Sequence, residues 1–283
     1  MKRGISVRLF DLHCDTLTRG VRQQSPFDPW VQTYAAFIPD GMKSADAWAH
    51  YDRLTALYRQ WRDDPVCGHT TLLSVENSGM LSPCESMFDR LAADGVVMAG
   101  LTWNGDNPWG GGCRTVHGEL NADGLRAVRE LERRGITVDV SHLGERGFWQ
   151  VDAIATAPYV ASHSNDAAVT PHPRNLTDEQ FIAIRDRGGV VGLTVYPPFV
   201  GDHSPQAFCR HVEHCWSLGG EKTVCIGSDI DGFDTPPVTA AYLAELYEHM
   251  TAQRYPSSLI EDLFYKNAYR FFFGTQDGKE EKL

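Results

Sequence analysis

Long apolar runs are missing from this sequence of 283 residues. A helix needs about 20 consecutive apolar residues to cross a bilayer, and no segment offers them. The first ten residues also lack the apolar core of a signal peptide, although Lys2 and Arg3 would provide its charged start. We therefore expect a protein of the cytoplasm, with no secretion signal and no membrane anchor.

Positive charge is scarce as well. There are 26 Lys and Arg against 37 Asp and Glu, which gives a formal net charge of -11. An acidic surface repels phosphate groups. This balance argues against nucleic acid, and against an anionic membrane surface, as the partner of the protein.

Cysteine pairs are also absent. The 7 cysteines are odd in number and scattered, a pattern that does not fit a disulfide framework. The sequence has no internal repeat, no low-complexity linker and no glycine-rich phosphate loop after its first apolar segment. The lack of that loop counts against an open, doubly wound sheet of the nucleotide-binding type.

What the sequence does contain is an alternation of strand-like and helix-like segments. Eight segments have the pattern of strands: residues 7–12, 31–38, 70–75, 95–101, 136–140, 159–162, 190–195 and 223–227. Strands that alternate with helices predict a parallel sheet. We predict an α/β fold, a closed (β/α)8 TIM barrel, with an open doubly wound sheet as the main alternative. We expect one domain over residues 1–283, with a frayed tail at 274–283.

Several helices are predicted from local signals. Capping boxes at residues 82–85 and 177–180 mark helix starts. The segment 257–272 is predicted as one continuous helix. On a further predicted helix, His211 and His214 are three residues apart, and we expect that face to be solvated.

Residues that can bind a metal ion follow the predicted strands. Each stands at or just after a strand end, and the set is His13, Asp15, Glu76, His142, His163 and Asp229. A single histidine at a strand end is usually structural, but the strand ends of a barrel converge on one face, where active sites lie. Imidazole and carboxylate together suit a divalent ion of the zinc type. The sequence therefore predicts a metal site.

The spacing of the first pair suits binding of both side chains to the same divalent metal ion. His13 and Asp15 are two residues apart, so an extended backbone directs both side chains to the same side. Cys14 between them points the other way, and we expect it to pack in the core.

The number of ligands predicts two ions. His13, Asp15 and Glu76 could hold one ion, and Glu76 could bridge to a second ion held by His142 and His163. A hydroxide between the ions would be the nucleophile, because metal ions lower the pKa of bound water. Asp229 would then accept its proton and pass it to the leaving group as a general acid/base.

Short motifs in the same order resemble the membrane dipeptidase (renal dipeptidase) family of amidohydrolase-like metal barrels. They are DLHCD at 11–15, SVE at 74–76, LTWN at 101–104, DVSH at 139–142, SHS at 162–164, RN at 174–175, YP at 196–197 and GSDIDG at 227–232. The resemblance implies a metal-dependent hydrolase barrel with two zinc ions that cleaves dipeptides and is a homodimer in many members. It assigns His13 and Asp15 to one zinc, Glu76 to the bridge, His142 and His163 to the other zinc, and Asp229 to acid/base catalysis.

The resemblance also implies substrate-binding residues. Arg174 matches the arginine that binds the terminal carboxylate of the substrate, a task for which a planar guanidinium is suited. Tyr196, Trp103 and Asn104 are expected beside the substrate. Trp103 departs from the family, because the best-known members have a histidine there. Since indole donates but cannot accept a hydrogen bond, Trp103 puts the substrate range in question.

The sequence supports one reading and leaves two rivals open. The preferred reading is a cytoplasmic zinc dipeptidase that acts on small dipeptides of the L-Xaa-L/D-Xaa type. A related metal-dependent amidohydrolase for N-acyl amino acids or lactams is the first rival, and Trp103 is the reason for it. A binding protein that has lost its metal ions is the second rival.

Overall fold

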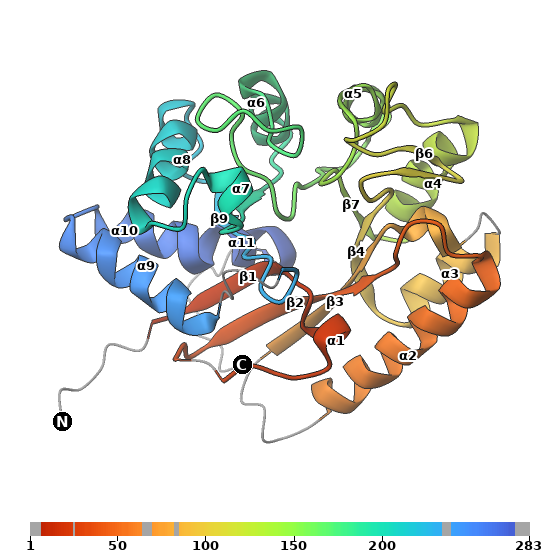
Figure 1. Cartoon of the computed structure of the whole chain (residues 1–283), viewed down its shortest axis with the longest axis horizontal. Coiled ribbons are helices and arrows are strands. Elements are labelled where there is room, and N and C mark those ends of the chain that lie inside the picture. Colours follow the sequence, from red (N-terminus) through yellow and green to blue (C-terminus); the bar gives the residue numbers. More distant parts are fainter. Residues whose placement is uncertain (1–6, 25, 64–69, 82–84, 234–238, 275–283) are drawn as a thin grey trace.

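The computed structural model describes residues 7–24, 26–63, 70–81, 85–233 and 239–274. A curled sheet of seven parallel strands lies at its centre (Figure 1). In spatial order the strands are β7 (Thr137–Asp139), β4 (Val96–Gly100), β3 (Thr70–Glu76), β2 (Trp30–Phe37), β1 (Leu9–Cys14), β9 (Val224–Ile226) and β8 (Val191–Leu193). The parallel sheet and the alternation with helices confirm the predicted α/β barrel class.

The curled sheet is closed by the segment that was predicted as the sixth strand, residues 159–162. This segment forms single parallel bridges, from Val160 to Asp139 of β7 and from Ala161 to Val191 of β8. Two glycines permit the close approach. A Cβ on Gly192 or on Gly227 would collide with the carbonyl oxygen of Ser162. The eighth position of the barrel is therefore filled by a bridging segment with too few ladder bonds to form a regular strand.

Helices cover the outside of the sheet. The longer ones are α2 (Ser44–Arg62), α3 (Glu85–Ala93), α4 (Ala122–Arg133), α5 (Glu145–Ile154), α6 (Asp178–Asp186), α8 (Pro205–Ser217) and α9 (Ala240–Ala252). The capping box at Thr177 and Gln180 is present at the start of α6. The one predicted at residues 82–85 lies largely outside the described residues. None of the helices in the described part of the chain is long and apolar enough to cross a membrane.

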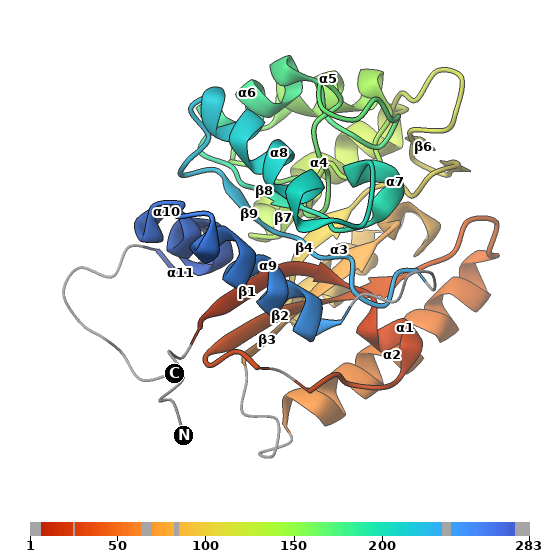
Figure 2. The same ribbon diagram turned by 60° about the vertical axis from the view of Figure 1, so that its left-hand side comes forward.

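The last helical segment closes the amino-terminal end of the barrel. It consists of α10 (Ser257–Glu261), a π-helical turn η2 (Asp262–Lys266) and α11 (Asn267–Phe273), so the predicted continuous helix is interrupted. These elements lie beside β1 (Figure 2). The ring of Phe10, near the start of β1, packs on Phe272 with 5.7 Å between centroids. With this end plugged by apolar side chains, the carboxyl ends of the strands remain for a site.

Short elements surround the carboxyl ends of the strands. They are α1 (Thr16–Arg19), the 3-10 helix η1 (Ser78–Leu81), the two-residue strands β5 (Asp106–Asn107) and β6 (Gly110–Gly111), and α7 (Pro197–Val200). Strands β5 and β6 pair as a small antiparallel sheet apart from the barrel. Among them, Thr18 of α1 and Phe199 of α7 line a cavity at these strand ends.

Candidate metal centre and active-site cavity

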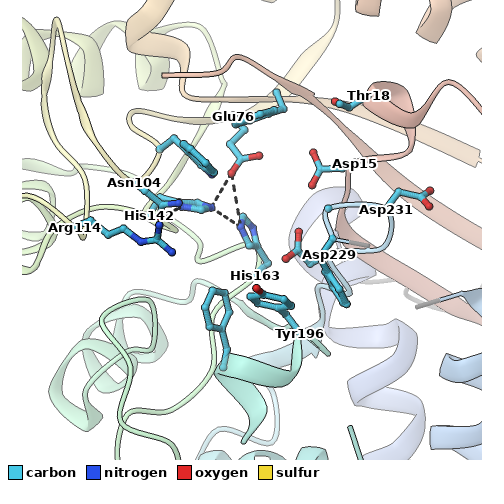
Figure 3. A pocket seen from close by; sticks show the side chains of 15 residues that line it. Asp15, Thr18, Glu76, Asn104, Arg114, His142, His163, Tyr196, Asp229 and Asp231 are labelled. Atoms are coloured by element: carbon cyan, nitrogen blue, oxygen red, sulfur yellow. Dashed lines mark hydrogen bonds and ion pairs between the residues drawn. The ribbon is translucent and has the colours of Figure 1, made fainter. Parts of the chain in front are cut away.

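A cavity of about 260 Å³ opens at the carboxyl ends of the strands. Its lining includes eight of the residues singled out in the sequence: Asp15, Glu76, Trp103, Asn104, His142, His163, Tyr196 and Asp229. His13 lies within β1 and is 1 % exposed. Figure 3 shows carboxylates and imidazoles from several strands directed toward one point. The strand ends therefore converge as the barrel prediction requires.

Unusual backbone angles accompany this convergence. Four non-glycine residues near the strand ends have a positive φ: Asn77 (63°), His142 (69°), Asp229 (61°) and Asp231 (68°). Side chains make this left-handed region unfavourable, so it persists only where surrounding contacts enforce it. Here it turns His142 and Asp229 inward directly after the parallel strands end.

Glu76 occupies the centre of the cluster. Its Oε2 lies 3.7 Å from Nε2 of His13. Its Oε1 lies 2.7 Å from Nε2 of His142 and 3.9 Å from Nε2 of His163 (Figure 3). Each oxygen of one carboxylate thus faces a different set of imidazoles, which is the orientation that a bridging ligand requires.

The other carboxylates gather around His13. Its Nε2 lies 3.6 Å from Oδ2 of Asp15 and 3.7 Å from Oδ1 of Asp229. Three sets of residues each offer ligand atoms that lie within 4.8 Å of one another. The sets are His13, Asp15 and Glu76; Glu76, His142 and His163; and His13, His163 and Asp229. The first two groups are the ligand sets predicted from the sequence.

The donor atoms of this cluster fit a cation. Nε2 of His13 and Oδ1 of Asp15 are buried without a hydrogen-bond partner. Nε2 of His142 and Nε2 of His163 lie only 2.8 Å apart. The lone pairs of two ring nitrogens at this distance repel each other unless a proton or a metal ion lies between them. Nitrogen and carboxylate donors at these positions suit zinc and similar divalent ions.

The charges of the cluster are mutually unfavourable without a cation. Burial and then the charge of Asp15 raise the pKa of Glu76 well above its usual value, and the same causes raise the pKa of Asp229 to about 7. Burial alone would lower the pKa of His13, but Asp15, Glu76 and Asp229 raise it to about 10. Carboxylates crowded at this density thus take up protons or require a positive ion.

The second ring nitrogens of two histidines are held by neighbours. Nδ1 of His142 lies 3.0 Å from Oδ1 of Asn104, an oxygen that can only accept. The Ser162 hydroxyl lies 2.5 Å from Oδ2 of Asp139, to which it donates, so it accepts from Nδ1 of His163 at 2.8 Å. Both histidines therefore carry their proton on Nδ1 and turn the lone pair of Nε2 toward the cavity, as metal-binding histidines do.

Two buried aspartates repeat one arrangement on opposite sides of the barrel. Asp139 accepts from the backbone N–H and the hydroxyl of Ser162, at 2.9 and 2.5 Å. Asp11 accepts from the same two groups of Ser228, at 2.8 and 2.5 Å. Both aspartates lie within the short motifs DLHCD and DVSH, but no role was predicted for them from the sequence. Their signal was a serine directly before the ligand residue at each of these strand ends.

Two aromatic residues predicted beside the substrate lie in the cavity wall. Trp103 packs on Phe37, with 5.2 Å between centroids. Tyr196 packs between Phe199 and Phe233, at 4.7 and 4.5 Å. The three phenylalanines also line the cavity and were not singled out in the sequence.

Asn104 and Arg174 lie closer to the histidines than to open space. Oδ1 of Asn104 is engaged with His142 and lies 3.3 Å from Sγ of Cys113. The guanidinium of Arg174, a residue that is 4 % exposed, donates to the carbonyl oxygen of His163 at 3.0 Å. Arg174 lines an adjacent cavity of about 430 Å³ that shares His142 with the first one.

One histidine on the helix face that was predicted to be solvated is buried instead. His211 in α8 is fully buried, and its Nδ1 lies 3.1 Å from Oδ2 of Asp166. The interpretation of that face as solvated was wrong for His211. Asp166 lies in a distant loop, so helical spacing gave no sign of it.

Several proteins have sequences similar to that of this chain. An uncharacterised protein from the 5' region of pqqA of Klebsiella pneumoniae is 34% identical over 197 residues, which cover 63% of this chain and 72% of that protein. The dipeptidase verJ of Clonostachys rogersoniana is 33% identical over 167 residues, or 57% of this chain and 43% of that protein. An uncharacterised dipeptidase of Schizosaccharomyces pombe is 27% identical and covers 74% of this chain. The chain spans about half the length of these two fungal relatives.

Solved structures share the fold. A metallopeptidase from Rhodobacter sphaeroides, bound to a phosphinate mimic of L-Ala-D-Ala, superposes with a TM-score of 0.83 at 24% identity over 95% of this chain and 99% of that chain. The probable dipeptidase PvdM from Pseudomonas aeruginosa gives a TM-score of 0.82 at 19% identity, with 95% of each chain covered. At these identities the likeness establishes the barrel fold.

The sequence family can be assigned directly. The model of the membrane dipeptidases, peptidase family M19, matches residues 32–282, which is most of the chain. This match confirms the resemblance read from the short motifs. The chain therefore belongs to the membrane dipeptidase family, peptidase family M19.

Proposed function

We propose that the protein is a zinc-dependent dipeptidase that hydrolyses the peptide bond of dipeptides of the L-Xaa-L/D-Xaa type. The observation that carries the proposal is the central position of Glu76. Its two carboxylate oxygens face His13 on one side and His142 with His163 on the other. This arrangement suits two ions that share one carboxylate.

The residues divide into two proposed metal sites. His13, Asp15 and Glu76 would hold one zinc, and Glu76, His142 and His163 would hold the other. When bound, such a pair supplies a Lewis acid for the peptide carbonyl and water activated for attack. The chain itself contributes the orientation of the imidazoles, which the hydrogen bonds from His142 to Asn104 and from His163 to Ser162 maintain.

Asp229 is proposed to move the proton. Its carboxyl group is buried beside Asp15, and its pKa is raised to about 7. Metal ions bound beside it would lower this pKa, so the support for its role is its position: its Oδ1 lies 3.7 Å from Nε2 of His13, next to the proposed metal sites, where a carboxyl group can accept and return a proton. It would take a proton from the attacking water and give it to the amine that leaves.

Arg174 is proposed to bind the terminal carboxylate of the substrate. It is buried, and it forms no ion pair with any carboxylate among the described residues. Its Nε has no hydrogen-bond partner. A buried guanidinium in this state is stabilised by an incoming anion. Tyr196 and Trp103 would form walls around the rest of the dipeptide, and Asn104 would serve mainly to hold His142.

A second candidate function follows from Trp103. Its ring packs on Phe37 in the cavity wall and offers the substrate no hydrogen-bond acceptor. A related amidohydrolase that takes N-acyl amino acids or lactams would tolerate such an apolar wall. The two functions differ in whether the substrate has a free amino group.

The test combines metal analysis with a substrate panel. Purified protein is expected to contain, or to take up, about two zinc ions per chain and to hydrolyse L,L- or L,D-dipeptides in the zinc-loaded form only. Faster hydrolysis of N-acyl amino acids or lactams than of any dipeptide would favour the second candidate. If no divalent ion co-purifies or can be restored, the protein is not a metalloenzyme and the proposal fails.

A further inference from the structure

The charges in the wall of the active-site cavity are strongly divided. Asp15, Glu76, Asp229 and Asp231 contribute carboxylates to the lining. Arg114 is the one Lys or Arg among the described residues that line it. Figure 3 shows Arg114 beyond His142 and Asn104, on the opposite side from Asp15 and Asp231. Zinc ions on Asp15 and Glu76 would offset much of that negative charge, so a ligand that lies across the cavity meets Asp231 at one end and Arg114 at the other.

The backbone of Arg114 is fixed to the residues that hold the site. Its N–H donates to the carbonyl oxygen of Asn104 at 3.0 Å. The preceding N–H, of Cys113, donates to the carbonyl oxygen of His142 at 2.8 Å. The loop that carries Arg114 is thus joined directly to His142 and its partner Asn104, so the backbone of Arg114 is held in position relative to the metal centre.

The side chain of Arg114 is not engaged. Its guanidinium has no hydrogen bond or ion pair to any residue in the part of the chain that the structure describes. By contrast, the guanidinium of Arg90 is paired with Asp52 at 2.7 Å. A free guanidinium in a cavity rich in carboxylates is available to an anion from solution.

A second guanidinium lies on the same side of the site. Arg174 stacks over the ring of Phe199, with its central carbon 5.4 Å from the centroid, and Phe199 lines the cavity. Burial, and then the charges of Arg174 and Arg114, hold the pKa of His172 below its usual value. Both arginines are therefore close enough to His172 to act on it, yet neither is paired with a carboxylate of the described chain.

We propose that Arg114 binds a second carboxylate of the substrate, so that the cavity selects dipeptides whose C-terminal residue is Asp or Glu. The inference rests on the proposed dipeptidase function, in which Arg174 takes the terminal carboxylate. The side-chain carboxylate of the same residue then reaches Arg114. The amino end of the substrate lies toward Asp231, whose charge attracts an ammonium group.

The test compares acidic substrates with their neutral isosteres. The zinc-loaded enzyme is expected to hydrolyse Ala-Asp or Ala-Glu with a kcat/KM about tenfold above that for Ala-Asn or Ala-Gln. The variant Arg114→Gln is expected to reduce this ratio to about one, mainly through a higher KM for the acidic substrate. Arg114→Lys, which keeps the charge but not the fork of donors, is expected to keep part of the preference.

Arg129→Gln provides the matched control. Arg129 is exposed on α4 and does not line the cavity, so its loss removes the same charge from the molecule without changing the acidic preference. A native enzyme that cleaves Ala-Ala but shows no preference for acidic residues would overturn the inference and leave the dipeptidase function intact. A preference that survives in Arg114→Gln would also overturn it. Absence of hydrolysis of every dipeptide would instead refute the proposed function, and this inference with it.

Discussion

At the scale of single residues, Asp229 shows how burial and backbone geometry combine to give one carboxyl group a special character. It has a φ of 61°, and its N–H donates to the carbonyl oxygen of His13 at 3.1 Å. The turn that follows is tight, because a Cβ on Gly232 would lie 2.5 Å from Oδ1 of Asp229. The carboxyl group of Asp229 is therefore held beside Asp15. Burial raises the pKa of Asp229, and the negative charge of Asp15 raises it further.

The substitution Asp229→Asn tests this role. It keeps the size of the side chain and removes the proton that the carboxyl group exchanges. General acid/base catalysis is worth about 10²- to 10⁴-fold, so kcat is expected to fall by that order while zinc content, measured by elemental analysis, stays the same. Asp123→Asn is the control and is expected to keep its turnover, since Asp123 is exposed on α4 and does not line the cavity. Near-normal turnover in Asp229→Asn would rule out its proposed role.

The residue scale also shows what could be predicted from the sequence. The six candidate ligands were recognisable because each stands at a predicted strand end, and parallel strands bring their ends together. Arg114 was not recognisable in this way, because it lies in a loop after β6 that reaches the cavity only through tertiary contacts with Asn104 and His142. The role of Asp11 could not be predicted, because it depends on a hydrogen bond to Ser228, which lies far away in the sequence.

At the scale of elements, the segment that closes the barrel with the fewest backbone hydrogen bonds can be accommodated only because its neighbour is a glycine. Residues 159–162 pair with β7 and β8 through single bridges, and the carbonyl of Ser162 approaches Gly192 of β8 closely. The next residue, His163, is a candidate ligand. The spacing between β8 and this segment therefore determines both the closure of the barrel and the place of one imidazole.

The substitution Gly192→Ala is expected to destabilise the protein by more than about 2 kcal/mol, because the new Cβ would collide with backbone and the core must shift. Urea unfolding followed by circular dichroism measures this loss. Gly100→Ala is the matched control: Gly100 ends β4, and the nearest atom to its Cβ would be 3.7 Å away, an ordinary contact. Equal stability of the two variants would show that the close approach to Ser162 is not required.

Element boundaries were predicted less well than element types, for physical reasons. The segment 257–272 has a continuous helical pattern, but the structure inserts the π-turn η2 between α10 and α11. The pattern of apolar residues cannot show such an insertion, since it changes the hydrogen bonds of one turn only. His211 is a similar case, because its burial depends on Asp166 of another element.

At the scale of the whole molecule, the candidate metal centre joins strands that are far apart in the sequence. β1, β3, β7 and β9 each end at or just before one of its residues, from His13 near the start to Asp229 near the end. We propose that residues 7–274 behave as one cooperative domain for this reason. In such a domain, an ion bound at the strand ends stabilises the entire barrel, because the unfolded chain cannot hold the ligands together.

Removal of metal is therefore expected to lower the melting temperature. An ion present at about 100 times its Kd adds about 2.7 kcal/mol to the stability of the folded state. For a chain of this size each kcal/mol shifts Tm by about 2–4 °C, so chelation should lower Tm by roughly 5–10 °C, and added zinc should restore it. Differential scanning calorimetry measures both changes. In Glu76→Gln, which weakens the shared ligand while removing one crowded negative charge, the zinc-free protein is expected to be at least as stable as the native one but to gain less from zinc. A Tm that is indifferent to chelator and zinc in the native protein would mean that the clustered carboxylates and imidazoles do not bind a structural or catalytic ion.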